Sequence, residues 1–81
     1  MIIRIQESAK KDLKNIDKKQ ALKILIQIKK LEEYPNITNI KKLKNHYPPM
    51  RYRVGNYRVL FDIENGFIVV VNIKHRKEAY K

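Results

Sequence analysis

The spacing of apolar positions changes along the chain, from a helical period in the first third to a strand period in the last third. Residues 1–6 alternate, with Ile3 and Ile5 on one face, which predicts a short strand. Further along, apolar side chains recur in steps of three and one and form one stripe on a helix. The stripe consists of Ala21, Ile24, Leu25, Ile28 and Leu31, widened to one side by Leu22 and Ile26.

Capping residues set the expected helix boundaries. Ser8 can cap a first helix beginning at Ala9, because its hydroxyl can accept a hydrogen bond from an unpaired N–H group of the first turn. Asp17 can cap a second helix in the same way. Pro35 ends that helix, since the residue before a proline avoids the α region. The following residues, 36–50, carry several cations and a Pro-Pro pair and are expected to be irregular.

From Arg51 onward the apolar period is two, which predicts a meander with a two-residue turn at Gly55-Asn56. The predicted strands cover residues 51–54, 57–63 and 67–74.

The connection between the last two strands allows two registers. A two-residue turn at Asn65-Gly66 would pair Ile63 with Ile68, whereas a three-residue loop would pair Ile63 with Phe67. A slip of one residue inverts a whole strand, so the register that gives continuous faces is preferred. We predict the three-residue loop, with one apolar face made of Tyr52, Val54, Tyr57, Val59, Phe61, Ile63, Phe67, Val69, Val71 and Ile73.

The order of elements predicts an α+β fold, with an N-terminal strand, two helices and an antiparallel three-stranded meander. Both helices are expected on the apolar face of one sheet. The chain has 81 residues, no internal repeat and no Gly/Ser linker, so a single domain over residues 1–81 is expected.

Composition narrows the choice of partner. The chain carries 19 Lys and Arg against 8 Asp and Glu, a formal net charge of +11. Such a charge attracts polyanions, so nucleic acid is the first expected partner, an acidic protein the second and an anionic membrane surface a distant third. With no cysteine and only His46 and His75, no metal site or cofactor is expected. No apolar run approaches the roughly 20 residues of a membrane span, and a cytoplasmic location is expected.

Cations alternate with apolar residues on both sides of the Gly55-Asn56 turn, which would place Arg53 opposite Arg58. Like charges that face each other across strands destabilise a sheet, so such a cluster indicates an anion-binding role. Arginine suits phosphate because it donates two parallel hydrogen bonds and keeps its proton. The predicted phosphate-binding residues are Arg51, Arg53, Arg58, Lys74 and Arg76, with Lys42 and Lys44 on a loop at the rim.

Two further residues are candidates for proton transfer. His75 lies between two cations, which favour its neutral form, and a neutral imidazole can accept a proton. Tyr80 can stack on an exposed base or take part in proton transfer, although a tyrosine that only covers an apolar edge is an equal alternative.

These motifs resemble the RelE/ParE superfamily of toxins from bacterial and archaeal toxin–antitoxin modules. The resemblance rests on Arg51-x-Arg53-Val54-Gly55-Asn56-Tyr57-Arg58-Val59 and on His75-Arg76 with Tyr80 four residues after the arginine. The ending favours the RelE branch, whose members cut messenger RNA in the ribosomal A site. The resemblance implies a metal-independent endoribonuclease in which the ribose 2′-hydroxyl attacks the adjacent phosphate.

The resemblance also implies roles for single residues. Arg51 and Arg53 match residues that hold the backbone phosphate. Some relatives have lysine at these positions, and a lysine can act as a base. Because arginine cannot, the role of the base shifts to His75 or Tyr80 in this chain. Arg58 and Arg76 match residues of the family that stabilise the negative charge of the five-coordinate phosphorus. Tyr80 matches a tail tyrosine that stacks on or activates the nucleotide, and the proton donor to the leaving group stays unassigned.

The implied partners are a cognate antitoxin and messenger RNA on the ribosome, with operator DNA contacted only through the antitoxin. The alternative function is that of ParE-type proteins, which inhibit DNA gyrase without nuclease activity. A third possibility is a basic nucleic-acid-binding module that cleaves nothing.

Overall fold

The computed structural model describes residues 1–77. A short strand comes first, two helices and a 3₁₀ turn follow, and four strands complete the chain. The elements are β1 (Ile2–Ile5), α1 (Glu7–Lys14), α2 (Lys18–Lys29), η1 (Lys30–Glu33), β2 (Ile40–Lys42), β3 (Met50–Val54), β4 (Tyr57–Glu64) and β5 (Phe67–His75).

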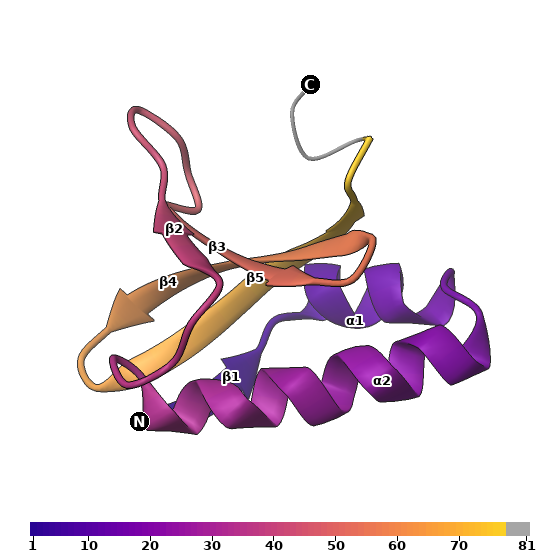
Figure 1. The fold of residues 1–81 in the computed structure, drawn as a ribbon, viewed down its shortest axis with the longest axis horizontal. Coiled ribbons are helices and arrows are strands. Elements are labelled where there is room, and N and C mark those ends of the chain that lie inside the picture. Colours follow the sequence, from indigo (N-terminus) through magenta and orange to yellow (C-terminus); the bar gives the residue numbers. More distant parts are fainter. Residues whose placement is uncertain (78–81) are drawn as a thin grey trace.

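The described strands form one sheet in the order β1-β5-β4-β3-β2, and both helices cover the same face of it (Figure 1). Strands β2 to β5 pair antiparallel, whereas β1 lies parallel to β5. The predicted α+β fold and the meander are confirmed. Strand β2 was not predicted, because it is only three residues long and lies in a segment expected to be irregular.

The core lies between the helices and the sheet. The helical layer contributes Ile24, Ile28 and Leu31, which lie one turn apart on α2 and η1 and are almost fully buried. The sheet contributes Val59, Phe61, Ile68, Val70 and Ile73. The apolar stripe of α2 is narrower than predicted, since Leu22 and Ile26 remain 57% and 62% exposed.

The predicted register between β4 and β5 is wrong. Ile63 pairs with Ile68 through a two-residue turn, in which Asn65 and Gly66 both have positive φ, as a tight hairpin turn requires. A β-bulge opposite Leu60 and Phe61 then shifts the pairing by one residue, so that Val59 pairs with Ile73 rather than with Val71, its partner in the predicted register.

This register changes which side chains of β5 reach the core. Ile68 and Val70 face the helices and are fully buried, whereas Phe67 and Val69 share a face with Arg4, on the other side of the sheet. The Arg4 guanidinium lies 4.6 Å from the centre of the Phe67 ring.

Helix α1 begins earlier than predicted, whereas α2 begins where the sequence predicted. Helix α1 begins at Glu7 with Gln6 at the N-cap position. The Ser8 hydroxyl makes no cap and instead donates a hydrogen bond to the Val71 carbonyl on β5. Asp17 occupies the N-cap position of α2 as predicted, although its side chain makes no capping hydrogen bond.

Candidate anion-binding site

The face of the sheet opposite the helices carries a row of three cations. Arg53 on β3 pairs with Arg58 on β4, and Arg58 pairs with Lys74 on β5. Paired residues share a face, so the three side chains leave the sheet on the same side, while neighbours such as Val59 and Ile73 point to the core. The register therefore places three positive charges side by side on three adjacent strands.

A second pair of cations lies beside this row. Lys41 on β2 pairs with Arg51 on β3, and Arg51 pairs with Leu60 on β4, so both cations lie on the same open face. Lys41 was not among the predicted site residues because β2 was not predicted. The sequence does carry a signal for Lys41. In an extended segment Lys41 faces the side opposite to its neighbours Ile40 and Lys42.

Arg58 is held by backbone carbonyl groups. Its side chain is buried, with only 7% of the residue exposed. Its Nη1 donates hydrogen bonds to the carbonyl oxygens of Gly55 (3.1 Å) and Tyr57 (3.0 Å). Within the described residues Nε is buried and has no hydrogen-bond partner. A buried donor without a partner is costly, so a bound anion that accepts from this guanidinium is favoured.

No carboxylate neutralises this row within residues 1–77. Arg53, Arg58 and Lys74 have no Asp or Glu oxygen within 4.0 Å, and the ion pair found in that part of the chain, Lys10 with Glu7, lies on α1. An unneutralised group of guanidinium and ammonium groups fits a phosphate, which accepts several charge-assisted hydrogen bonds at once.

The turn between β3 and β4 also anchors Arg76. The Arg76 backbone N–H donates a 2.7 Å hydrogen bond to the Asn56 carbonyl oxygen. The turn therefore holds Arg58 by its side chain and Arg76 by its main chain. Gly55 supplies the positive φ of +57° that this turn needs.

His75 lies on the other side of the sheet. It pairs with Tyr57, which packs against the core, and the two rings meet edge to face with centroids 5.4 Å apart. Its ring lines a small cavity together with Asp12, Asn15 and Ile16 from the helical layer. The structure therefore does not bring His75 together with Arg58 and Lys74.

The remaining predicted site residues are spread out. Lys42 is exposed and pairs with Met50, so it leaves β2 on the side opposite to Lys41. Lys44 is exposed in the loop before β3. Tyr80, predicted as catalytic, lies outside the described residues. No cluster of three or more potential metal ligands occurs in residues 1–77, and none of their helices is long and apolar enough to cross a membrane.

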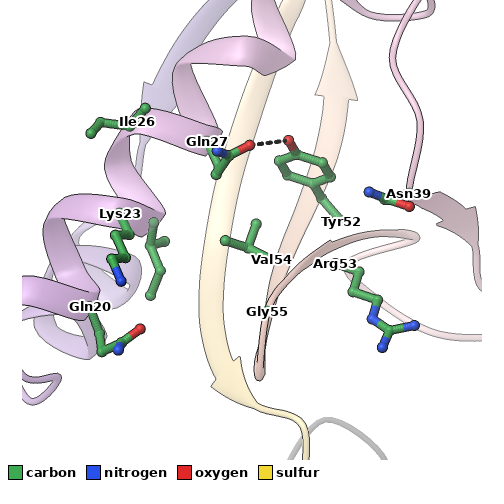
Figure 2. A pocket seen from close by; sticks show the side chains of 10 residues that line it. Gln20, Lys23, Ile26, Gln27, Asn39, Tyr52, Arg53, Val54 and Gly55 are labelled. Carbon is green, nitrogen blue, oxygen red and sulfur yellow. Dashed lines mark hydrogen bonds between the residues drawn. The ribbon is translucent and has the colours of Figure 1, made fainter.

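A groove of about 470 Å³ lies between α2 and the end of β3 (Figure 2). The Tyr52 hydroxyl donates a 3.3 Å hydrogen bond to the Gln27 side chain across it. Burial, and secondarily the negative charge of Glu33, raises the pKa of Tyr52. Arg53 belongs to this groove and to the cationic row. The lining residues are Gln20, Lys23, Ile24, Ile26, Gln27, Asn39, Tyr52, Arg53, Val54 and Gly55.

Comparison with known proteins places these features in a family. The family model of the ParE toxin of type II toxin–antitoxin systems, parDE, matches residues 3–80. The toxin RelE3 of Methanocaldococcus jannaschii is 30% identical over 74 residues, which are 86% of this chain and 84% of that protein. The chain belongs to the RelE/ParE superfamily of toxins.

Solved structures of this superfamily have the same fold. The RelB–RelE antitoxin–toxin complex from Methanococcus jannaschii matches with a TM-score of 0.76 and 26% identity, covering 94% of this chain and 93% of that one. The RelBE2 toxin–antitoxin complex from Mycobacterium tuberculosis matches with a TM-score of 0.79 at 21% identity, covering 93% and 96%. The isolated E. coli RelE toxin matches with a TM-score of 0.72 and 16% identity, covering 98% of this chain and 89% of that one. The family predicted from the Arg-rich hairpin is thus confirmed, and the chain is a toxin of RelE type.

Proposed function

We propose that this toxin is a metal-independent endoribonuclease that cuts messenger RNA in the ribosomal A site. The observation that carries the proposal is the row of Arg53, Arg58 and Lys74, whose central guanidinium is buried against carbonyl groups and has no carboxylate partner within residues 1–77. A phosphodiester that gains negative charge during the reaction is the anion that such a row would stabilise best.

The proposed reaction is an internal transfer of the phosphate. The 2′-hydroxyl loses its proton and forms a bond to phosphorus, and the bond from phosphorus to the 5′-oxygen breaks. The products are a 2′,3′-cyclic phosphate and a 5′-hydroxyl, which takes up a proton. Arg58 and Arg76 would stabilise the charge on the five-coordinate phosphorus. Arg51 and Arg53 would hold the backbone, helped by Lys41 on the same face and by Lys44 in the loop before β3, whereas Lys42 leaves β2 on the opposite side.

The two proton transfers need groups other than arginine, which keeps its proton. Lys74 stands next to Arg58 in the row, and its ammonium group is the donor we assign to the 5′-oxygen. The base remains His75 or Tyr80. His75 faces the helices, so a direct role would require the end of β5 to turn, and the position of its ring favours Tyr80 as the base.

An antitoxin would hold the toxin inactive. Related toxins have been crystallised with RelB-type antitoxins. A net charge of +11 suits an acidic partner that associates rapidly and in a salt-dependent way. Operator DNA would be contacted through the antitoxin, and action on translating ribosomes would place the protein in the cytoplasm.

Inhibition of DNA gyrase is the second candidate function, because the matching family model is that of the ParE toxin. One experiment separates the two. The chain is expressed from an inducible promoter, and the ends of messages and the integrity of the chromosome are followed together. RNA cleavage predicts messages cut within codons before DNA synthesis changes. Trapped gyrase–DNA complexes with intact messages would instead establish the alternative.

A further inference from the structure

Strand β2 leaves part of the edge of β3 uncovered, and the groove between α2 and β3 opens there. Strand β2 pairs with β3 only from Met50 to Tyr52, and the hydrogen bond from the Arg53 N–H to the Asn39 carbonyl oxygen (3.0 Å) follows. Past Arg53 no strand within residues 1–77 covers this edge. Arg53 lines the groove and also belongs to the cationic row, so the groove and the row meet at this residue.

The charged side chains of the groove favour an anion. Lys23 stands on α2 and Arg53 on β3, and both residues are exposed (Figure 2). Among the described residues that line the groove there is no Asp or Glu. Cations on both sides of a hollow suit a ligand that carries a phosphate group at each end. A nucleotide inside an RNA chain has this arrangement, because one phosphate joins it to each neighbour.

The uncharged side chains of the groove suit a nucleobase. Val54 and the buried Ile24 supply apolar surface for a flat ring. Carboxamide groups both donate and accept hydrogen bonds, as the edge of a base does. The carboxamide oxygen of Gln27 accepts the 3.3 Å hydrogen bond from the Tyr52 hydroxyl, which leaves its NH2 group as a donor. The lining carboxamides are those of Gln20, Gln27 and Asn39.

We propose that the groove binds a nucleotide, with the base against Ile24 and Val54 and the phosphate groups at Lys23 and Arg53. The volume of about 470 Å³ lies within the roughly 300–1,000 Å³ that is usual for small-molecule sites. Two sources offer this chemistry, namely a nucleotide of the RNA substrate and a free mononucleotide. The first source rests on the proposed function, whereas the second does not.

A nucleotide of the substrate reaches the groove around the uncovered edge of β3. The phosphate on Arg53 is then shared with the cationic row, so the nucleotide in the groove is a close neighbour of the one that is cut. The carboxamide groups distinguish one base from another through hydrogen bonds to its edge. The groove therefore contributes to the sequence preference of the toxin.

The first test measures the affinity for RNA of two pairs of α2 variants. The probe is a single-stranded RNA with a 2′-deoxy sugar at the cleavage position, which the full-length toxin binds but cannot cut. Lys23→Glu reverses a charge of the groove, whereas Lys19→Glu reverses an exposed charge that does not line it. We expect at least a tenfold loss of affinity for Lys23→Glu and less than a threefold change for Lys19→Glu, because only Lys23 contacts a phosphate.

The second pair tests the place of the base. Gln20→Trp fills the groove without a change of charge, and Leu22→Trp adds the same bulk at a position that is 57% exposed and outside the lining. The same RNA is made with an abasic site at each neighbour of the cleavage position in turn. In the wild type and in Leu22→Trp one of these abasic sites should weaken binding at least tenfold, and in Gln20→Trp this penalty should disappear.

Photo-crosslinking identifies where the base lies. The neighbouring nucleotide is replaced by 4-thiouridine, the complex is irradiated and the adducts are mapped by mass spectrometry. We expect adducts in residues 20–27 of α2 or on Tyr52. The four nucleoside 5′-monophosphates are titrated into RNA-free toxin by calorimetry in parallel. Adducts on α2 assign the groove to the RNA chain, whereas a mononucleotide whose affinity falls at least tenfold in Lys23→Glu, without such adducts, assigns it to a free nucleotide.

The outcomes separate this inference from the proposed function. If Lys23→Glu behaves like Lys19→Glu, the adducts lie only on the open face of the sheet and no mononucleotide binds, the groove is not a nucleotide site, while cleavage of messages by the wild type would leave the proposed function intact. A wild-type chain that cuts no RNA but binds a mononucleotide in the groove would remove the proposed function and keep the site.

Discussion

Arg58 is the residue on which the site depends. A guanidinium that is buried between Arg53 and Lys74 contributes little to folding, because like charges in one cross-strand row repel by up to about 1 kcal/mol per pair. Its two hydrogen bonds to carbonyl groups offset part of that cost. We therefore interpret Arg58 as a residue placed for anion binding at the expense of stability.

Replacing Arg58 should therefore separate activity from stability. We predict that Arg58→Met lowers the rate of RNA cleavage at least a hundredfold, since a lost charge-stabilising donor costs on the order of 3 kcal/mol in the transition state. The free energy of unfolding should stay within about 1 kcal/mol of the wild type. Urea unfolding measures this, with Lys18→Met as a control that removes the same charge far from the row. A loss of several kcal/mol would show that Arg58 is a structural residue.

Lys74 tests the assignment of the proton donor. Lys74→Arg keeps the charge and the position in the row but cannot give up a proton near neutral pH. We predict that RNA affinity, measured with the 2′-deoxy RNA, changes less than threefold while the single-turnover rate falls at least thirtyfold. Lys74→Met should lower both. Equal rates for wild type and Lys74→Arg would mean that the lysine acts only through its charge.

The sequence predicted the cationic row well, and for a physical reason. Strict alternation and the Gly55-Asn56 turn require Arg53 to face Arg58 whatever the rest of the fold does. The same alternation puts His75 and Lys74 on opposite faces of β5, which the prediction of His75 as a catalytic residue of the same cluster did not take into account. The partner of Arg58 on β5 could not be found in this way, because Asn72 rather than Lys74 faces Arg58 in the register predicted without the bulge.

Among the elements, the turn between β3 and β4 organises the site. Its residues hold the Arg58 side chain and the Arg76 main chain. The turn between β4 and β5 offers a natural control at the far end of the same strand. Gly55 and Gly66 have φ values of +57° and +83°, and an added Cβ would meet no atom within 4 Å at either.

Alanine at these two glycines should cost similar stability but affect function differently. Both substitutions strain a left-handed residue by roughly 1–2 kcal/mol. We predict that Gly55→Ala lowers RNA cleavage at least tenfold, because the carbonyl groups that hold the two arginines shift, while Gly66→Ala leaves cleavage within threefold. Thermal unfolding and the cleavage rate are measured on both. A parallel loss of activity would mean that stability alone sets the rate.

The contact between α2 and β3 makes a prediction about pH. The pKa of Tyr52 is raised in the folded state above its ordinary value of 10.0, mainly by burial. Below pH 10 the phenol is neutral in both states and the full stability is present. As the pH rises further, the unfolded chain ionises first, so the free energy of unfolding falls until the folded-state pKa is passed.

Tyr52→Phe should remove this decline. The control is Tyr47→Phe, which removes an exposed tyrosine and should leave the decline of the free energy of unfolding unchanged. Urea unfolding between pH 8 and pH 11 measures the difference between the two variants. An identical decline in both would show that Tyr52 is not its source.

The elements that the sequence did not predict share a cause. Strand β2 and the bulge in β5 are set by pairing with a neighbour, and no local pattern of apolar positions encodes them. The two-residue turn at Asn65-Gly66 was recognised as an alternative, yet face continuity favoured the other register because a bulge was not considered. The helices, β1 and the β3–β4 hairpin depend on local periodicity and were predicted correctly in kind.

In the whole molecule, the two faces of the sheet have different surroundings. The helices and the core-facing side of the sheet enclose the apolar core, and the open face carries Arg53, Arg58 and Lys74 side by side on three adjacent strands. A net charge of +11 on 81 residues adds long-range attraction for polyanions. The groove at the end of β3 lies at the border of the two parts and is lined by Arg53.

Cleavage of a message on a programmed ribosome is the decisive measurement of the proposed activity. Purified toxin is added to ribosomes that hold a defined message with an empty A site, and the ends of the RNA are identified chemically. We predict a cut within the A-site codon that leaves a 2′,3′-cyclic phosphate and a 5′-hydroxyl, at a rate at least a hundredfold lower for Arg58→Met. An intact message with the wild-type protein, or equal cutting by Arg58→Met, would contradict it.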